Sequence, residues 1–327
     1  MKEAEFWHKE QNQSVRCDLC PHHCLIMDGK HGLCRVRVNR NGVLYSGEYG
    51  KVVSFAVDPI EKKPLYHFYP GSDILSVGVN GCNLMCKFCQ NWQISQEKTA
   101  TRYVSPQDMI NLAKKYNSFA IAYTYTEPTI WYEYIMDCFV LAHENGIKNV
   151  LVTNGYLNKE PLMRLAPLTD AMNIDLKSMD DEFYRNICGG SLEPVLEFIE
   201  YSAKITHIEL TNLIIPTLND SDELLNKLVS WVASVNPEIP IHFSAYYPQY
   251  KMKIPPTSAE TLERAYKIAS KHLKYVYIGN LMTDYGSNTY CPKCNNLLIK
   301  RNGYKIDTTG LFADRCDKCK TEIPIIC

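Results

Sequence analysis

The sequence predicts an α/β protein with a largely parallel sheet. From about residue 73, short apolar runs rich in β-forming residues alternate with amphipathic segments, which is the pattern of repeated βα units. The runs are almost continuously apolar, as parallel strands buried on both faces are, so a barrel or an open doubly wound sheet is favoured over a sandwich. The six or seven expected strands lie at 74–79, 119–123, 149–152, 171–176, 207–215, 241–245 and 275–278.

Helices are expected between these strands, and two of them have clear local signals. A helix over 106–116 follows Ser105, a good N-cap residue, and begins with Pro106, which is well tolerated at the first helical position. A second amphipathic stretch covers 222–235. In a barrel or an open sheet, catalytic groups belong at the carboxyl ends of the strands, where the loops converge.

Composition and charge describe an ordinary globular chain. Of its 327 residues, 46% are hydrophobic and 22% charged, and the formal net charge is -1. A chain so nearly neutral has no overall field to attract nucleic acid or an anionic membrane. The polar N-terminus and the absence of any run of about 18–20 apolar residues predict a cytoplasmic protein.

Cysteine usage indicates metal ligation. The chain has 14 cysteines, and a reducing compartment disfavours disulfides as their explanation, although disulfides in an exported protein are the alternative. Eleven of them fall into three tight groups. The groups are Cys17, Cys20, Cys24 and Cys34; Cys82, Cys86 and Cys89; and Cys291, Cys294, Cys316 and Cys319.

These groups divide the chain into three expected parts. Residues 1–72 form a four-cysteine metal-binding knuckle with a β-rich lead-in, in which Asp58-Pro59 and Lys63-Pro64 interrupt the strands. Residues 73–285 form the βα domain, and residues 286–327 form a separate four-cysteine ribbon.

The central cysteines follow directly on the first expected strand of the βα domain. Their spacing is C-x3-C-x2-C, over Cys82, Cys86 and Cys89. Three thiolates in one loop can ligate three irons of a [4Fe–4S] cluster and leave the fourth iron open to a substrate. The alternatives are a three-thiolate zinc site and redox cysteines.

With Phe88 just before the third cysteine, this loop resembles the motif of the radical S-adenosylmethionine (SAM) superfamily. The resemblance implies a partial (β/α)6 TIM-like barrel and a cluster whose open iron binds SAM. It also implies reductive cleavage of SAM to a 5′-deoxyadenosyl radical, with Phe88 beside the adenine.

Further segments narrow the resemblance to the radical SAM proteins of the AmmeMemoRadiSam system, relatives of the activating enzymes for glycyl radical enzymes. This resemblance runs over nearly the whole chain and implies AMME-type and Memo-type partner proteins. The segments that carry it are 66–72, 123–129, 153–156, 174–178 and 215–220.

The resemblance also assigns residues to SAM. Glu127 stands where the superfamily has a Gly-Gly-Glu motif that binds the SAM amino group, although Thr124-Tyr125-Thr126 replaces the glycines here. Its alternative role is to cap a turn before Pro128. Asn154 follows the third strand and is a further cofactor-binding candidate.

Asp175 and Lys177 alternate along the fourth strand and are expected on one face, directed inward. Such a pair resembles the motif by which glycyl-radical activating enzymes contact the ribose and carboxylate of SAM. A purely structural ion pair has equal weight.

Other polar residues in the βα domain are expected to be structural. His242, in the sixth strand, is interpreted as a core residue, and Cys138 and Cys188 as small buried hydrophobes. Asp220 is expected to cap the helix that begins near residue 221.

The outer cysteine groups have the composition of metal sites. The C-terminal spacing C-x2-C-x21-C-x2-C predicts tetrahedral ligation of Zn²⁺, and a single iron would fit the same geometry. At the N-terminal group a structural zinc knuckle is favoured slightly over an auxiliary [4Fe–4S] cluster, with His22 and His23 as spare ligands.

The sequence thus predicts a radical SAM enzyme, of oxidoreductase or lyase type, whose radical abstracts hydrogen from an unidentified small molecule. A one-electron donor such as ferredoxin or flavodoxin is an expected partner. One alternative is an activating enzyme that acts on a glycine of a partner protein. The alternative from another class is a non-catalytic iron–sulfur or zinc scaffold.

Overall fold

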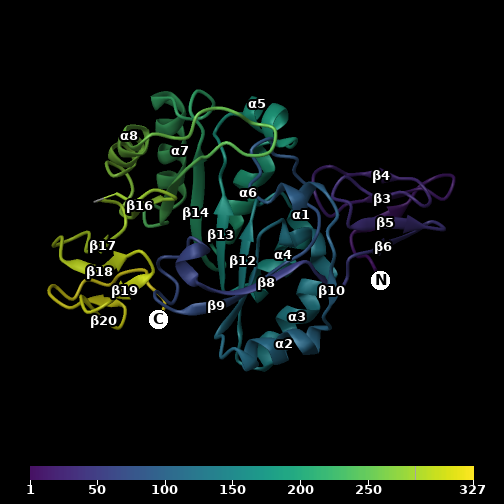
Figure 1. The fold of residues 1–327 in the computed structure, drawn as a ribbon, viewed down its shortest axis with the longest axis horizontal. Helices are drawn as coiled ribbons and strands as arrows, with labels where there is room; N and C mark the ends of the chain where they lie inside the picture. The colour runs from purple at the N-terminus through teal and green to yellow at the C-terminus, as the bar shows by residue number, and fades with distance from the viewer. Residues whose placement is uncertain (284) are drawn as a thin grey trace.

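The computed structural model describes residues 1–283 and 285–327, and within them an eight-stranded sheet forms the centre of the molecule (Figure 1). The strand order is β16-β15-β14-β13-β12-β11-β9-β8, in which β8 alone runs antiparallel to its neighbour. The two end strands are not paired with each other, so the sheet is a partial barrel. The bounds are β8 Ser54–Pro59, β9 Asp73–Gly78, β11 Ala120–Tyr123, β12 Lys148–Thr153, β13 Ala171–Asp175, β14 His207–Ile214, β15 Ile241–Ala245 and β16 Val276–Gly279.

The predicted α/β class is confirmed, and every expected strand is present within one residue of its predicted bounds. The sequence predicts that residues 54–59 belong to an irregular lead-in, whereas the structure places them in the sheet as β8. It pairs along its whole length with β9, from Ser54 opposite Gly78 to Pro59 opposite Asp73. Pro59 is tolerated because it stands at the end of an edge strand.

Helices cover the outside of this sheet (Figure 1). Ser105 caps α2 as expected: its hydroxyl accepts a hydrogen bond from the Asp108 N–H, and the Asp108 carboxylate accepts one in return, which completes a capping box. The α-helices are α1 Trp92–Gln96, α2 Pro106–Lys115, α3 Tyr132–Glu144, α4 Lys159–Leu165, α5 Asp181–Phe183, α6 Glu193–Ser202, α7 Asp222–Val235 and α8 Ala259–Ala269. Short 3-10 or π turns are η1 Ile60–Lys62, η2 Pro128–Trp131, η3 Ala166–Leu168 and η4 Tyr184–Cys188.

The N-terminal and C-terminal small elements lie on opposite sides of the sheet (Figure 1). The N-terminal element has two small antiparallel sheets, β1-β6-β5 and β2-β3-β4, and β7 pairs with β10. Its strands are β1 Lys2–Glu3, β2 Trp7–Lys9, β3 Val15–Cys17, β4 Leu25–Ile26, β5 Arg37–Arg40, β6 Val43–Ser46, β7 Lys51–Val52 and β10 Arg102–Tyr103. The C-terminal strands are β17 Thr289–Tyr290, β18 Leu297–Asn302, β19 Lys305–Asp307, β20 Leu311–Phe312 and β21 Arg315–Cys316.

A polar network ties the C-terminal element to the sheet. The His67 backbone N–H donates to the buried Glu209 carboxylate at 2.7 Å, and the His67 ring bonds to the Tyr277 hydroxyl at 2.6 Å. The Ile326 N–H donates to the His67 carbonyl at 2.8 Å. His242 bonds to Glu209 at 2.7 Å and is 2% exposed, so its interpretation as a satisfied core residue is confirmed.

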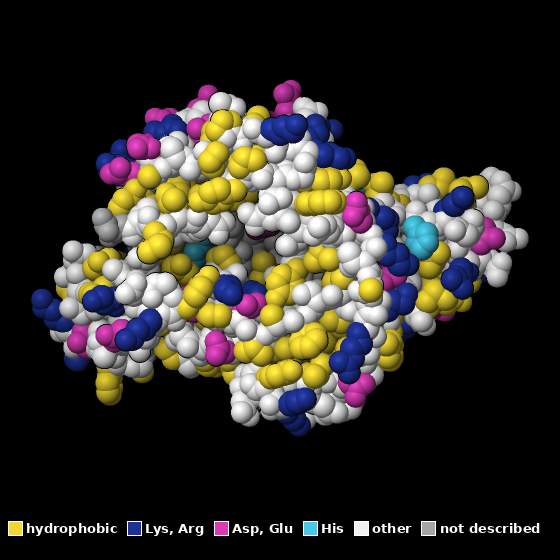
Figure 2. Space-filling view, in the orientation of Figure 1, with side chains coloured by type: hydrophobic (Ala, Val, Ile, Leu, Met, Phe, Trp, Pro, Cys, Tyr) yellow, Lys and Arg dark blue, Asp and Glu magenta, His cyan; other side chains and the backbone are white. Residues whose placement is uncertain are grey.

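Acidic and basic side chains are interspersed over the face that Figure 2 shows, in keeping with the net charge of -1. The same view shows a hollow between the part of the molecule that carries α7 and α8 and the part that carries β8. Among the described residues, no helix is both long enough and apolar enough to cross a membrane.

Candidate active site

A cavity of about 340 Å³ lies at the carboxyl ends of the parallel strands, and its size is within the range of small-molecule sites. The loop between β9 and α1 forms one wall of it. All eight residues that were predicted to hold the cluster or SAM line this cavity. They are Cys82, Cys86, Phe88, Cys89, Glu127, Asn154, Asp175 and Lys177.

Two of the three thiols of this loop have hydrogen-bonding groups beside them. Cys82 Sγ accepts from the Leu84 N–H at 3.4 Å and lies 3.7 Å from the Asn154 amide nitrogen. Cys89 Sγ is 3.1 Å from the Ser95 hydroxyl. Such donors stabilise thiolate ligands, so the site fits a metal cluster.

The three cysteines of this loop share one cavity, because Cys82, Cys86 and Cys89 all line it. Three thiolates gathered in one loop can bind three different irons of a polynuclear cluster.

The turn η4 is joined by two backbone hydrogen bonds to the loop that carries Cys82, Cys86 and Cys89, here called the cluster loop. The Cys188 carbonyl accepts from the Met85 N–H at 2.7 Å, and the Ile187 carbonyl accepts from the Lys87 N–H at 3.0 Å. A hydrogen bond from the Cys188 thiol lowers the pKa of Cys86. Cys188 is fully buried, as expected, but its contact with Cys86 was not foreseen, because about 100 residues of chain separate the two.

Glu127 is buried and its carboxylate accepts three hydrogen bonds. The donors are the Thr129 N–H at 2.9 Å, the Thr153 hydroxyl at 2.8 Å and the Asn154 N–H at 2.7 Å. Burial raises the pKa of this carboxyl, although the three donors oppose the shift. Glu127 therefore caps the turn before Pro128 and joins β11 to β12, while it also lines the cavity.

Asn154 fastens the cluster loop to β12. Its amide nitrogen donates to the Asn83 side-chain oxygen at 2.9 Å, and its side-chain oxygen accepts from the Tyr156 N–H at 2.9 Å. The Asn83 amide donates in turn to the Tyr156 carbonyl at 2.7 Å. Asn154 is 6% exposed, so much of its hydrogen-bonding capacity serves the loop.

Asp175 and Lys177 form an ion pair in the cavity wall, with 2.8 Å between Nζ and Oδ2. Burial disfavours the charged ammonium, but the Asp175 carboxylate holds the pKa of Lys177 well above its ordinary value. Lys177 Nζ also lies 5.9 Å from the centre of the Phe88 ring. The prediction that both residues face inward is confirmed.

Another part of the cavity wall involves charged residues that sequence reasoning missed. Asp58, at the end of β8, accepts from Lys63 at 2.8 Å, from Lys62 at 3.1 Å and from the Tyr125 hydroxyl at 3.0 Å. Although burial opposes it, these donors lower the pKa of Asp58 to about 2. Lys62, Lys63 and Tyr125 line the cavity, so this wall carries more positive than negative charge.

One sequence expectation near the site is wrong. Asp220 does not cap α7; Ser221 is the N-cap and accepts from the Leu224 N–H at 3.2 Å. Asp220 instead accepts from the Thr217 N–H at 2.7 Å, which stabilises a turn in which Thr217 has a positive φ of 68°.

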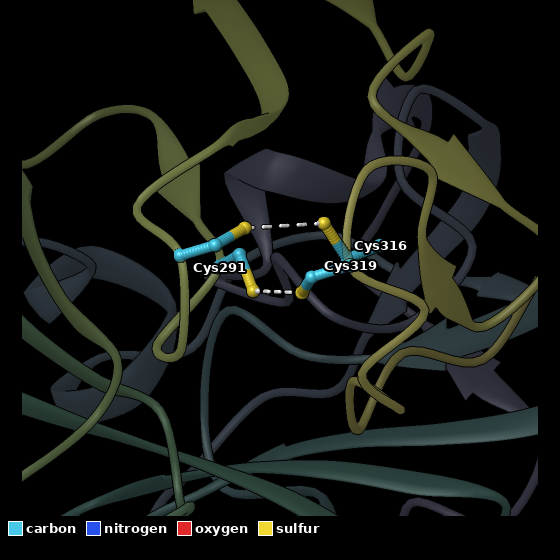
Figure 3. A group of neighbouring side chains, drawn as sticks. Cys291, Cys316 and Cys319 are labelled. Atoms are coloured by element: carbon cyan, nitrogen blue, oxygen red, sulfur yellow. Dashed lines mark hydrogen bonds between the residues drawn. The ribbon is translucent and has the colours of Figure 1, made fainter.

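The C-terminal cysteines converge on one point (Figure 3). Cys291 Sγ lies 3.5 Å from Cys319 Sγ, and Cys294 Sγ lies 3.7 Å from Cys316 Sγ. Four thiolates about 2.3 Å from a central ion would be spaced at about 3.8 Å in a tetrahedron. This group therefore fits a single tetrahedral metal ion.

The N-terminal cysteines also face a common cavity, and Cys17, Cys20, Cys24 and Cys34 all line it. The two neighbouring histidines have other hydrogen bonds. His22 Nε2 lies 2.7 Å from the Asn83 carbonyl, and His23 Nδ1 lies 3.1 Å from the Asp18 carboxylate.

Comparison with known proteins agrees with this site. The family model of the radical SAM superfamily matches residues 76–232. An uncharacterized protein of Methanocaldococcus jannaschii, MJ0808, is 47% identical over the whole of both chains. The pyruvate formate-lyase 1-activating enzyme of Escherichia coli K12 is 24% identical over 59% of this chain and 86% of its own length.

Solved structures agree on the fold. SuiB of Streptococcus suis bound to S-adenosylmethionine superposes with a TM-score of 0.53, at 15% identity over 71% of this chain and 56% of SuiB. A radical SAM methyltransferase of Sphaerobacter thermophilus gives a TM-score of 0.50, at 17% identity over 70% and 71% of the two chains. The chain belongs to the radical SAM superfamily and is related to the pyruvate formate-lyase-activating enzymes.

Proposed function

We propose that this protein binds SAM in the strand-end cavity and uses it to abstract hydrogen from a small-molecule substrate. Cys82, Cys86 and Cys89 would hold a [4Fe–4S] cluster, which supplies the electron that cleaves SAM to methionine and a 5′-deoxyadenosyl radical. The observation that carries the proposal is the convergence of all eight predicted site residues on one cavity.

The side chains around the loop would orient SAM. Lys177 is held in its charged form by Asp175, so it would offer an ammonium to the SAM carboxylate. Phe88, beneath that ammonium, would supply an apolar face to the adenine. Glu127 already accepts three hydrogen bonds, so any contact with the SAM amino group would add to its capping role.

A small substrate is favoured over a protein glycine by the cavity itself. Lys62, Lys63 and Tyr125 line the same cavity as the thiols and give it polar groups suited to a small ligand. The activating-enzyme alternative is supported by the relationship to the E. coli enzyme. The same proposal includes membership of the AmmeMemoRadiSam system, with AMME-type and Memo-type partner proteins. It also includes a ferredoxin-like or flavodoxin-like electron donor.

We also propose Zn²⁺ at the C-terminal four-cysteine group. The support is its compact sulfur spacing, which suits a single ion, and the strands that bring two C-x2-C turns together (Figure 3). The zinc would hold the ribbon in the shape that docks against the sheet.

The first test is the spectrum of the reduced, anaerobically reconstituted protein before and after SAM is added. Binding of SAM to an open iron changes the electron paramagnetic resonance (EPR) signal of the cluster, and we expect that change. A cluster that forms but does not respond to SAM would support the scaffold alternative. Transfer of deuterium from a labelled glycine of a partner protein into 5′-deoxyadenosine would favour the activating enzyme over a small substrate.

A further inference from the structure

Two lysines of the strand-end cavity, here called the lysine pair, share a single carboxylate. Lys62 and Lys63 both line the cavity, and their Nζ atoms lie 3.1 and 2.8 Å from the two carboxylate oxygens of Asp58. Glu61, next to them in the chain, does not line the cavity, and its carboxylate accepts from the Gly71 N–H at 2.8 Å. Among the described residues, Asp58 therefore balances only one of the two ammonium charges.

The other charged side chains of the cavity wall are already engaged with protein groups. Asp175 pairs with Lys177 at 2.8 Å. The Glu127 carboxylate accepts three hydrogen bonds. The described residues that line the cavity include no further carboxylate and no arginine. The lysine pair is therefore the part of the wall with charge to spare, and that charge is positive.

Lys63 is the buried member of the pair, with 3% of its surface exposed. Its ammonium has three N–H donors, yet among the described residues its hydrogen-bond partner is Asp58 alone. Burial lowers the pKa of Lys63, and the Asp58 carboxylate opposes that shift. An anion bound at this ammonium would use a free donor and favour the charged form further.

Tyr125 holds the pair from a strained backbone conformation. Its φ of 70° is uncommon for a residue other than glycine. Its hydroxyl donates to Asp58 at 3.0 Å, and Lys63 Nζ lies 4.8 Å from the centre of its ring. The ring packs so closely on β9 that a Cβ at Gly78 would lie 3.0 Å from it. Strain of this kind is concentrated at ligand sites, which favours a binding role over a purely structural ion pair.

The carboxylate that anchors the lysine pair is separated along the sheet from the cluster loop. Asp58 stands opposite Ile74, whereas the cluster loop begins beyond Gly78, at the other end of β9. The four steps of strand from Ile74 to Gly78, at about 3.3 Å each, correspond to about 13 Å. The pair is therefore better placed for a substrate group remote from the reacting carbon than for a SAM group bound at the cluster.

We propose that the substrate carries an acidic group, either a carboxylate or a phosphate, which Lys63 and Lys62 bind. This inference rests on the proposed function and adds the class of substrate to it. Charge-assisted hydrogen bonds from the two ammonium groups would hold the acid, while Asp58 and Tyr125 keep those groups in place. The carbon that loses hydrogen would then lie toward the cluster loop.

Binding of two simple anions tests the proposal without turnover. The probes are inorganic phosphate and isotope-labelled acetate, added at constant ionic strength to the anaerobically reconstituted, unreduced protein with SAM. Broadening of the phosphorus or carbon resonance measures exchange with the bound ion, and the tighter of the two distinguishes phosphate from carboxylate. We expect saturable binding, with Kd raised roughly 10-fold or more in Lys63→Met. Lys159→Met, at the exposed start of α4, is the matched control and should bind as the wild type does.

A variant that gains affinity guards against misfolding. Asp58→Asn removes the carboxylate that competes for both ammonium groups, so the same anion should bind more tightly than it does to the wild type. A damaged fold would not produce such a gain. Equal affinity of the wild type and Lys63→Met for both anions, or the absence of a gain in Asp58→Asn, would overturn the proposal.

The result can be separated from that of the proposed function. Anion binding requires no SAM cleavage, and the EPR response to SAM is measured on the same protein after reduction. A wild-type protein that responds to SAM but binds neither anion would keep the proposed function and lose this class of substrate. If Lys63→Met weakens the SAM-dependent EPR change as strongly as loss of the Lys177 ammonium does, the lysine serves SAM itself and the proposal is overturned.

Discussion

At the residue scale, the polar side chains of the candidate active site differ in how much of their hydrogen-bonding capacity is used within the protein. Glu127 and Asn154 are fixed by hydrogen bonds to β12 and the cluster loop, so their first task is to hold that loop in place. Asp175 and Lys177 bond mainly to each other and face the cavity. The second pair is therefore better placed than the first to exchange its contacts for those of a ligand.

Removal of one loop thiol should abolish the chemistry. We expect Cys86→Ala to form no 5′-deoxyadenosine from SAM, because a cluster held by two thiolates is not retained. The control is Cys327→Ala, since Cys327 is exposed and lies far from the loop in sequence. Product formation by Cys86→Ala at the wild-type rate would show that this thiol is not a ligand.

Removal of the ammonium at Lys177 should weaken SAM binding without loss of the cluster. Lys177→Met keeps the length of the side chain but cannot bond to a carboxylate, and a hydrogen bond to a charged group is worth about 1.5–3 kcal/mol, or roughly 10- to 150-fold in Kd. Titration of the SAM-dependent EPR change measures it. Lys159→Met, on the exposed side of α4, is the control; equal affinities in the two variants would refute the role of Lys177.

At the element scale, the segment between β8 and β9 connects the sheet with the C-terminal ribbon. His67 lies in this segment, fully buried between Glu209, Tyr277 and the end of the chain. Burial lowers the pKa of His67 to about 3. The ring is therefore neutral in the folded protein, whereas it would become protonated in the unfolded chain below its ordinary pKa of about 6.5.

This burial predicts a loss of stability in mild acid. Since the pKa of His67 is lower in the folded state, the unfolded state binds the extra proton, and stability falls as the pH drops from about 6.5 toward 3. Between about pH 7 and pH 5.5 the loss should be about 1 kcal/mol. Urea unfolding of wild type and His67→Gln at both values measures it, and identical pH dependence in the two proteins would contradict the assignment.

Elements with a local signal could be predicted from the sequence, and those fixed by distant contacts could not. The bounds of α7 and the cap of α2 follow from amphipathic spacing and from Ser105 with Pro106. The joining of β8 to the sheet depends on pairing with β9 across a 13-residue connection, which no local pattern encodes. The same is true of Cys188 and of Lys63, which reach the site only through tertiary packing.

At the scale of the whole molecule, two four-cysteine elements flank the sheet on opposite sides (Figure 1). The C-terminal one is anchored through Arg301, whose guanidinium donates to the Tyr66 carbonyl at 2.8 Å and lies 4.2 Å from the Tyr66 ring. The N-terminal one contacts the loop that carries Cys82, Cys86 and Cys89 instead. The two elements therefore have different tasks: the first stabilises the fold and the second borders the chemistry.

Loss of the C-terminal metal should destabilise the protein and leave its iron in place. In Cys316→Ser we expect one equivalent of zinc to be lost and the thermal midpoint to fall by roughly 5 °C or more, which corresponds to about 2 kcal/mol in a domain of this size. Elemental analysis and calorimetry measure both effects, with Cys327→Ser as control. A decrease in iron with unchanged zinc would contradict this division of tasks.

The most direct test of the proposed SAM cleavage is the fate of SAM in the anaerobically reconstituted protein with dithionite. We expect 5′-deoxyadenosine and methionine to appear in equal amounts, and neither to appear when Cys82, Cys86 and Cys89 are replaced by alanine. Intact SAM after prolonged incubation of a fully loaded and reduced protein would contradict it.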